Sequence, residues 1–235
     1  SHKELTERLK EMAFFDPLSG LPNRVLLRDR LNQALAHARR AERRVGVMFI
    51  DLDNFKAVND SFGHEFGDRV LQVAAGVIAG SVREEDTIAR LGGDEFVIVL
   101  PAIDRPEDAG KVAHKIMERF ERTLHVDGQE VNLSLSVGIA LSQEGDESVD
   151  ELLKHADLAM YLAKEKGKGH FRFFTPSLDT EMLERLNLER DLRLALERGE
   201  LSLHYQPQLD LHDLRITGME ALLRWRHPDR GMVPP

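Results

Sequence analysis

The chain has 235 residues, of which 42% are hydrophobic and 31% are charged, enough for one full hydrophobic core and a smaller additional element. Its net charge of −9 argues against a general affinity for nucleic acid or for anionic membrane surfaces. The absence of cysteine excludes disulfides and thiol catalysis, and no apolar run approaches the roughly 18–20 residues of a membrane-spanning helix.

The N-terminal part of the chain predicts two helices. Residues 3–14 carry apolar side chains at i, i+4 and i+7, which fits either a short core-facing helix or the end of a coiled-coil stalk. A second helix is expected to begin at Pro22-Asn23, because leucines then recur every four residues. Ser1-His2 is typical of a tag remnant, so the chain is expected to be an excised fragment.

The next element is the apolar run over residues 45–51, which predicts a buried strand ending near Asp51 and Asp53. Strand residues alternate between faces, so both carboxylates are expected to point the same way. Beside a second acidic element they would suit a two-metal site. Asp at a strand end is also common turn chemistry, so the strand alone leaves both interpretations open.

That second acidic element lies in a predicted hairpin. A helix over about residues 61–80 is expected first, and then strands at 87–91 and 97–100. Between these strands stand Gly92-Gly93, which allow a sharp turn and a close ligand, and Asp94-Glu95, which can hold a hard divalent cation. Without the upstream strand, the same residues would fit an ordinary solvated turn.

The remaining elements alternate. A helix at about residues 106–122, a strand at 130–140 and a helix at 149–166 complete an α/β layered domain. Residues 177–199 predict a connecting helix, and residues 201–208 alternate like a strand.

Several of these segments together resemble the GGDEF family of diguanylate cyclases. They are DPLSGLPNR from Asp16, DLDNFKAVND from Asp51, Phe62-Gly63-His64, Gly67-Asp68, GGDEF from Gly92, and DLAMYLAK from Asp157. The resemblance covers about residues 14–175 and implies a ferredoxin-like palm, with a central, mostly antiparallel sheet and flanking helices as in nucleotidyl cyclases.

The family reaction joins two GTP molecules into cyclic di-GMP and releases two pyrophosphates, so the resemblance implies GTP as substrate and a homodimer for catalysis. It assigns Mg²⁺ or Mn²⁺ to Asp51, the Leu52 carbonyl, Asp94 and Glu95. Asp94 and Glu95 are the catalytic candidates, and we favour Asp94 as the group that accepts the 3′-hydroxyl proton.

The resemblance also implies a set of substrate-binding residues. These are Phe55, Lys56, Asn59, His64, Asp68, Gly92, Gly93, Lys164 and Lys168, with Asn59 and Asp68 at the guanine-binding positions. From the residues alone, Asn59-Asp60 fits a helix N-cap equally well, His64 a first-turn surface residue, and the lysines a solvated cluster. Lys164 and Lys168 share a helical face if that helix continues. Lys168 stands where the family typically has arginine, so it keeps the charge without the bidentate fork.

Arg83 and Asp86 match the inhibitory product site of the family, where cyclic di-GMP would bind. The same residues fit an exposed turn with a local ion pair. A supporting arginine from a neighbouring helix is often found in the family, and Val112 to Lys115 contains none.

The C-terminal part resembles the start of an EAL domain, the family of cyclic di-GMP phosphodiesterases. Glu220-Ala221-Leu222 carries the motif, with Glu220 at a metal position and Gln206 and Arg224 at dinucleotide positions. An EAL barrel needs about 250 residues, so the fragment is expected to lack phosphodiesterase activity and to leave strand edges unpaired.

The expected organisation is a linker helix end (residues 1–14), a GGDEF domain (15–175), a connecting helix (176–199) and a truncated EAL segment (200–235). The leading hypothesis is an active, cytoplasmic cyclase domain without nucleic-acid or membrane contact in this fragment; the full-length protein could have an upstream membrane tether. The alternatives are a catalytically silent domain that senses GTP or cyclic di-GMP, and an unrelated palm-fold cyclase acting on ATP.

Overall fold

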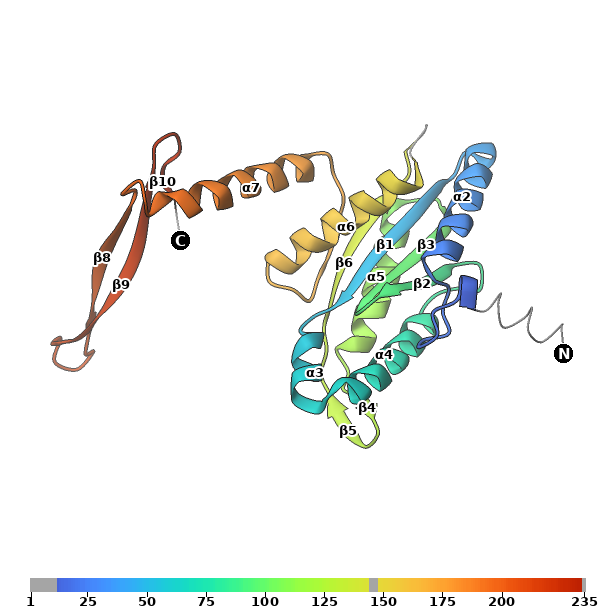
Figure 1. The fold of residues 1–235 in the computed structure, drawn as a ribbon, viewed down its shortest axis with the longest axis horizontal. Helices are drawn as coiled ribbons and strands as arrows, with labels where there is room; N and C mark the ends of the chain where they lie inside the picture. The colour runs from blue at the N-terminus through green and yellow to red at the C-terminus, as the bar shows by residue number, and fades with distance from the viewer. Residues whose placement is uncertain (1–11, 144–147, 234–235) are drawn as a thin grey trace. The chain divides into compact units, whose positions relative to one another are not determined.

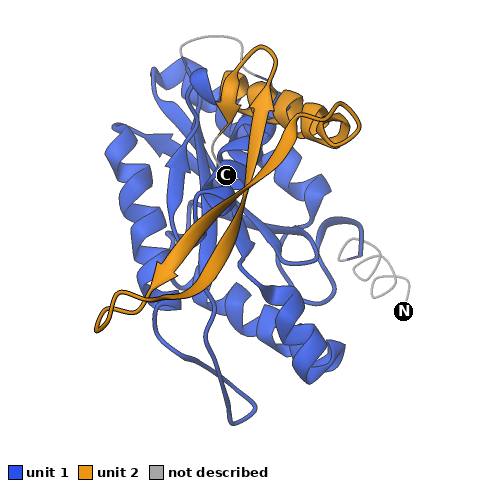
Figure 2. Cartoon of the chain, turned by 90° about the vertical axis from the view of Figure 1, so that its left-hand side faces the viewer, with its two compact units in different colours: residues 1–178 blue, residues 179–235 orange. Residues whose placement is uncertain are grey.

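The computed structural model describes residues 12–143 and 148–233. The chain divides into two compact units, residues 1–178 and residues 179–235 (Figure 2). All the candidate cyclase residues lie in the first unit.

The first unit is built on a five-stranded sheet with the order β2-β3-β1-β6-β7 (Figure 1). Its strands are β1 (Arg44–Leu52), β2 (Thr87–Gly92), β3 (Glu95–Ile103), β6 (Leu135–Leu141) and β7 (Phe171–Phe173). Only the β6–β7 pair is parallel. The mixed, mostly antiparallel sheet with flanking helices confirms the predicted fold class.

Helices cover both faces of this sheet (Figure 1). They are α2 (Arg24–Ala41), α3 (Phe55–Phe62), α4 (His64–Ala79), α5 (Pro106–Phe120) and α6 (Val149–Glu165). Alternate residues of β1 divide the core: Met48 and Ile50 pack with α4 and α5, whereas Val47 and Phe49 pack with α2 and α6. Burial on both faces explains why β1 is a continuous apolar run.

One close approach fixes α6 against β6. A Cβ atom added at Gly138 would collide with the backbone of Ala156 and Met160, so a glycine is needed at this contact. The start of α6 is held by a capping box, in which Ser148 and Glu151 bond each other's backbone N–H groups. The end of α6 is thereby positioned beside the end of β1.

Two predicted elements differ from the structure, and a third lies mostly outside the described residues. The helix expected over residues 61–80 is α4, which begins at His64 after Gly63 with a φ of +85°, and residues 55–62 form a separate helix, α3, that was not expected. The strand expected at residues 130–140 is the second half of a hairpin, β4 (Leu124–Val126) and β5 (Gln129–Val131), followed by β6. Of the helix expected at residues 3–14, all but the last three residues lie outside the described part of the chain.

The second unit contains most of α7 (Ser177–Ala195) and an antiparallel sheet of β8 (Leu201–Leu209), β9 (Ile216–His227) and β10 (Gly231–Val233). The strand expected at residues 201–208 pairs along its length with β9, where Gln206 lies opposite Glu220. Within the described ranges, no helix combines the length and the apolar character needed to cross a bilayer.

Candidate functional site

The β2–β3 hairpin brings two acidic residues to the end of β1. Gly92 and Gly93 form the turn with φ values of +142° and +54°, which L side chains rarely adopt. Glu95 then pairs with Asp51 across the strands, and the Leu52 N–H donates to the Asp94 carbonyl at 3.3 Å. The structure therefore places the three acidic residues assigned to the metal, Asp51, Asp94 and Glu95, at adjacent strand ends.

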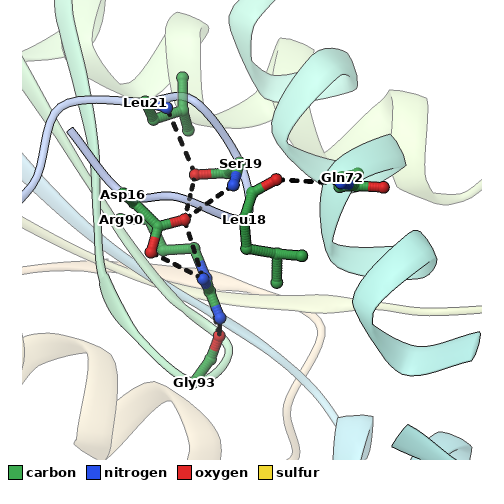
Figure 3. A network of polar contacts seen from close by, with 7 residues as sticks. All are labelled: Asp16, Leu18, Ser19, Leu21, Gln72, Arg90 and Gly93. Carbon is green, nitrogen blue, oxygen red and sulfur yellow. Dashed lines mark hydrogen bonds and ion pairs between the residues drawn. The ribbon is translucent and has the colours of Figure 1, made fainter. Parts of the chain in front are cut away.

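The hairpin tip is bonded to Arg90, which forms an ion pair with Asp16 (Figure 3). Arg90 donates from Nε and Nη2 to the Gly93 carbonyl at 3.0 and 2.7 Å, and from Nη1 to both Asp16 carboxylate oxygens at 2.9 Å. The side chains of Arg90 and Asp16 are only 9% and 15% exposed. The sequence motifs do not reveal this contact, because Asp16 and Arg90 are 74 residues apart in the chain.

Asp16 stays charged in this network. Although burial opposes the charged form, hydrogen bonds from Ser19 and the Arg90 guanidinium hold the pKa of Asp16 below its ordinary value. Ser19 donates its N–H and its hydroxyl to Asp16 Oδ2 at 2.8 and 2.7 Å. Gln72 of α4 donates to the Leu18 carbonyl at 3.0 Å, which ties the same turn to the helix layer.

Lys164, near the end of α6, forms an ion pair with Asp51. Its Nζ is 2.6 Å from Asp51 Oδ2, and the two side chains are 30% and 7% exposed. Burial, followed by the charges of Asp94 and Asp53, raises the pKa of Asp51 to about 6 despite this lysine. Burial and the charges of Asp157 and Asp94 likewise raise the pKa of Glu95.

These residues fit a hard divalent cation. The donor set is oxygen alone, and the pKa of Asp51 is raised first by burial and then by the neighbouring charges of Asp94 and Asp53, an environment that a bound cation would relieve. In the described part of the chain, no three acidic, histidine or cysteine side chains are grouped closely enough to hold a metal. Mg²⁺ is usually held by one or two carboxylates together with substrate phosphates and water, so such a partial set is sufficient.

Asp53 does not share this environment. β1 ends at Leu52, so strand alternation does not extend to Asp53. Its carboxylate is 2% exposed and accepts hydrogen bonds from the Ser134 and Ser136 hydroxyls, both at 2.7 Å, and from the Gly169 N–H at 3.0 Å. The strand alternation from which a shared direction of Asp51 and Asp53 was predicted therefore stops before Asp53, and a two-metal site facing both carboxylates stays a prediction.

Lys168 reaches the site by a route different from the predicted one. The helix α6 ends at Glu165, so Lys164 and Lys168 do not share a helical face. Lys168 follows with a φ of +59°, and its Nζ donates to Asn54 Oδ1 at 2.8 Å. Both lysines nevertheless converge on the segment that follows β1.

The α3–α4 pair carries the predicted guanine positions. Asn59 lies inside α3, so the alternative that it caps the next helix is wrong. A Cβ at Gly67 would collide with Asn59 Oδ1, and Asp68 follows directly after Gly67. Gly67, to which the sequence assigned no role beyond the family motif, therefore makes room for the Asn59 side chain.

The other substrate candidates surround this pair. Phe55 is buried at the start of α3, whereas Lys56 and Asp68 are exposed. His64 is the first residue of α4 and is also exposed, as the surface interpretation expected.

Arg83 and Asp86 line a separate cavity of about 390 Å³. The Arg83 N–H donates to Asp86 Oδ2 at 2.9 Å, and burial raises the pKa of Asp86. Lys111 and Lys115 of α5 line the same cavity. Helix α5, whose residues 112–115 contain no arginine, thus supplies two lysines to this cavity, a role that the sequence did not suggest.

Comparison with known proteins gives two matches to family models. The model described as "Diguanylate cyclase, GGDEF domain" matches residues 13–170, and the EAL domain model matches residues 189–235. Both therefore fall on the regions that carry the sequence motifs.

Curated relatives match nearly the whole chain. The bifunctional diguanylate cyclase/cyclic di-GMP phosphodiesterase MucR of Pseudomonas aeruginosa is 47% identical over 97% of this chain and 33% of its own length. The cyclic di-GMP phosphodiesterase PdeR of Escherichia coli is 41% identical over 97% of this chain and 34% of its own. The chain spans about a third of the length of these relatives.

The fold also matches a solved structure. The GGDEF domain of TpbB (YfiN) from Pseudomonas aeruginosa is 39% identical, with a TM-score of 0.70, over 72% of this chain and 99% of that one.

Proposed function

Because the chain belongs to the GGDEF domain family, we propose that its first unit is a diguanylate cyclase, which condenses two GTP molecules into cyclic di-GMP and two pyrophosphates. The resemblance seen in the sequence is confirmed by the family match and by the fold of TpbB. The activity itself is our proposal.

The observation that carries the proposal is the convergence of opposite charges at the end of β1. Asp51, Asp94 and Glu95 lie at adjacent strand ends, and Lys164 and Lys168 converge on the same segment. Carboxylates that crowd together beside lysines suit a nucleoside triphosphate bound with a divalent cation. An ordinary acidic turn would not need two lysines from a distant part of the chain.

Each residue then has a role in the reaction. A cation held by Asp51, the Leu52 carbonyl, Asp94 and Glu95 would neutralise charge on the α-phosphate during attack by the 3′-hydroxyl. Lys164 and Lys168 would hold the phosphates.

Asp94, or Glu95 with its raised pKa, would accept the hydroxyl proton, because a proton acceptor works best when its pKa lies near the working pH. Guanine recognition falls to Asn59 and Asp68, which offer a donor and acceptors to the base edge. His64 and Lys56 would contact the bound nucleotide from the α3–α4 side.

Turnover needs two such units. Each site holds one GTP, and each 3′-hydroxyl attacks the other nucleotide, so a symmetric dimer with facing sites is part of the proposal. We further propose that cyclic di-GMP inhibits the enzyme at Arg83 and Asp86, where Lys111 and Lys115 supply the positive charge for its phosphates.

The test is incubation of the purified chain with GTP and Mg²⁺ over a range of protein concentrations, followed by chromatography of the products. We expect cyclic di-GMP to increase faster than linearly with protein, and Asp94→Ala to abolish it. GTP binding without product from a dimer enforced by a fused coiled coil would favour the silent sensor instead. The relative PdeR, named only as a phosphodiesterase, makes that alternative worth testing.

A further inference from the structure

Asp53 is a buried carboxylate whose hydrogen-bond donors are all uncharged. It is 2% exposed, and its donors are the hydroxyls of Ser134 and Ser136 and the N–H of Gly169. A buried carboxylate is costly unless its oxygens are hydrogen-bonded. These three donors satisfy the buried carboxylate and hold the Asp53 side chain in one position.

The donors come from two different parts of the fold. Ser134 directly precedes β6 and Ser136 lies at its start, opposite Asp51 of β1, and the Ser134 carbonyl also accepts the Asp53 N–H at 2.9 Å. Gly169 belongs to the segment after α6, where it has a φ of +63°. Asp53 therefore joins the end of β1, the start of β6 and the loop of residues 166–170.

This loop carries Lys168, one residue before the bonded Gly169. The Nζ of Lys168 donates to Asn54 Oδ1 at 2.8 Å, and the Lys168 carbonyl is 2.8 Å from His170 Nδ1. The His170 carbonyl in turn accepts the Val137 N–H at 3.1 Å. The lysine is thus held at a defined place, directly after the segment that carries Asp51.

A role as metal ligand does not fit Asp53. A carboxylate offers about four lone-pair positions, and three are already used. The 2% exposure leaves no room for the waters that a hard cation keeps. Asp51, two residues earlier, is instead paired with the partly exposed Lys164, which a cation could replace as its counter-charge.

We propose that Asp53 is a positioning residue for the phosphates of the nucleotide: it fixes the loop of residues 166–170 so that Lys168 lies beside the metal-binding segment, and it takes no part in holding the metal. This inference rests on the proposed function of the site. It assigns two neighbouring acidic residues of one motif to different tasks.

The substitution Asp53→Asn separates positioning from metal ligation. An amide oxygen can accept from Ser134 and Gly169, and the amide NH₂ can donate to Ser136, whose hydroxyl can rotate to accept. The network is then kept although the charge is lost. A metal ligand, by contrast, would be disabled by that loss of charge.

The experiment measures two affinities on the full chain: Mn²⁺ by electron paramagnetic resonance, and a fluorescent non-hydrolysable GTP analogue by titration. We expect Asp53→Asn to keep both affinities within about threefold, since its hydrogen-bond network is kept and only the strength of each bond changes. Asp51→Asn should lose Mn²⁺ binding by more than about tenfold. The exposed Asp60→Asn is the matched control for a charge change nearby.

A second variant removes the donors and keeps the carboxylate. Ser134→Ala combined with Ser136→Ala should weaken nucleotide binding by about three- to tenfold, with Mn²⁺ affinity unchanged. Loss of Mn²⁺ binding in Asp53→Asn equal to that in Asp51→Asn would overturn the inference alone. If the unmodified chain bound neither probe, the proposed function would fail and this inference with it.

Discussion

At the scale of single residues, Asp51 carries its charge in a position where burial and two neighbouring carboxylates oppose it. Its pKa is raised from an ordinary value of 3.8 to about 6. The folded state therefore binds a proton more readily than the unfolded state, and the free energy of unfolding falls as the pH rises from about 4 to about 6. The charge that suits the site for a cation thus weakens the metal-free fold.

We predict that Asp51→Asn stabilises the chain in metal-free buffer at pH 7.5. The gain is at most about 3 kcal/mol, because one pKa unit corresponds to about 1.4 kcal/mol and water at the site screens part of it. Urea titrations at pH 7.5 and pH 4 check this, since the gain should vanish at the lower pH. Added Mg²⁺ should stabilise only the unmodified chain. A variant less stable than the unmodified chain at pH 7.5 would contradict the prediction.

Asp16 has the opposite pH dependence. Its pKa is lowered in the folded state, so its contribution to stability is present above the ordinary pKa and is lost as the pH falls through the folded value. We predict that Asp16→Asn lowers the free energy of unfolding by about 2–4 kcal/mol at pH 7, because it leaves the buried Arg90 without its counter-charge.

Urea midpoints measured from pH 7 down to pH 3 check the prediction, because the difference between Asp16→Asn and the unmodified chain should shrink below about pH 4. Asp150→Asn serves as control: Asp150 pairs with Arg28 at the surface, where its side chain is 75% exposed. That change should alter stability little. Equal losses from both variants would mean that burial of the Asp16 pair does not matter.

The residue roles that the sequence could not supply have a common cause. The sequence predicted the same direction for Asp53 and Asp51, because the motif carries no information on which hydrogen-bond donors surround each carboxylate. The available signal was the pair of serines two residues apart, Ser134 and Ser136, in the strand expected at residues 130–140, since alternation there would place both hydroxyls on one face. The partners of Arg90 and the lysines of α5 depend on long-range contacts that no local pattern encodes.

At the scale of elements, the α3–α4 pair depends on a contact between Asn59 and Gly67. We predict that Gly67→Ala weakens binding of the GTP analogue by about tenfold, because the added methyl displaces Asn59 at a cost of about 1–3 kcal/mol. Titration with the fluorescent analogue measures this.

Gly76 provides a matched control on the same helix, since a Cβ there meets nothing within 4 Å. Gly76→Ala should leave nucleotide binding unchanged and raise stability by about 0.5–1 kcal/mol, the usual gain in a helix interior. Similar binding losses in the two variants would show that helix propensity, rather than the Asn59 contact, is responsible.

Hydrophobic periodicity predicted α2, β1, α5 and α6 closely, because each is long and packs one apolar face. It missed the short helix α3 and began the next helix before Gly63, since only the local backbone shows the turn at that glycine. It also missed β7, which has three residues and pairs in parallel with a strand far away in sequence.

At the scale of the whole molecule, the candidate site and its supports belong to the first unit. The three buried clusters that hold the sheet and its helices all lie within residues 27–178. We predict that a chain shortened to residues 1–178 folds and binds the GTP analogue as tightly as the full chain. Circular dichroism and titration test this, and loss of cooperative unfolding in the shortened chain would refute it.

The Arg90 brace links the hairpin tip to the segment at the start of the domain. Asn23 donates to the Ala13 carbonyl at 2.9 Å, and the Arg90 N–H donates to the Pro22 carbonyl at 3.0 Å. The Arg90 guanidinium then donates to the Gly93 carbonyl. A displacement of the chain at Ala13 would therefore reach the acidic turn through these hydrogen bonds along the edge strand of the sheet, rather than through the hydrophobic core.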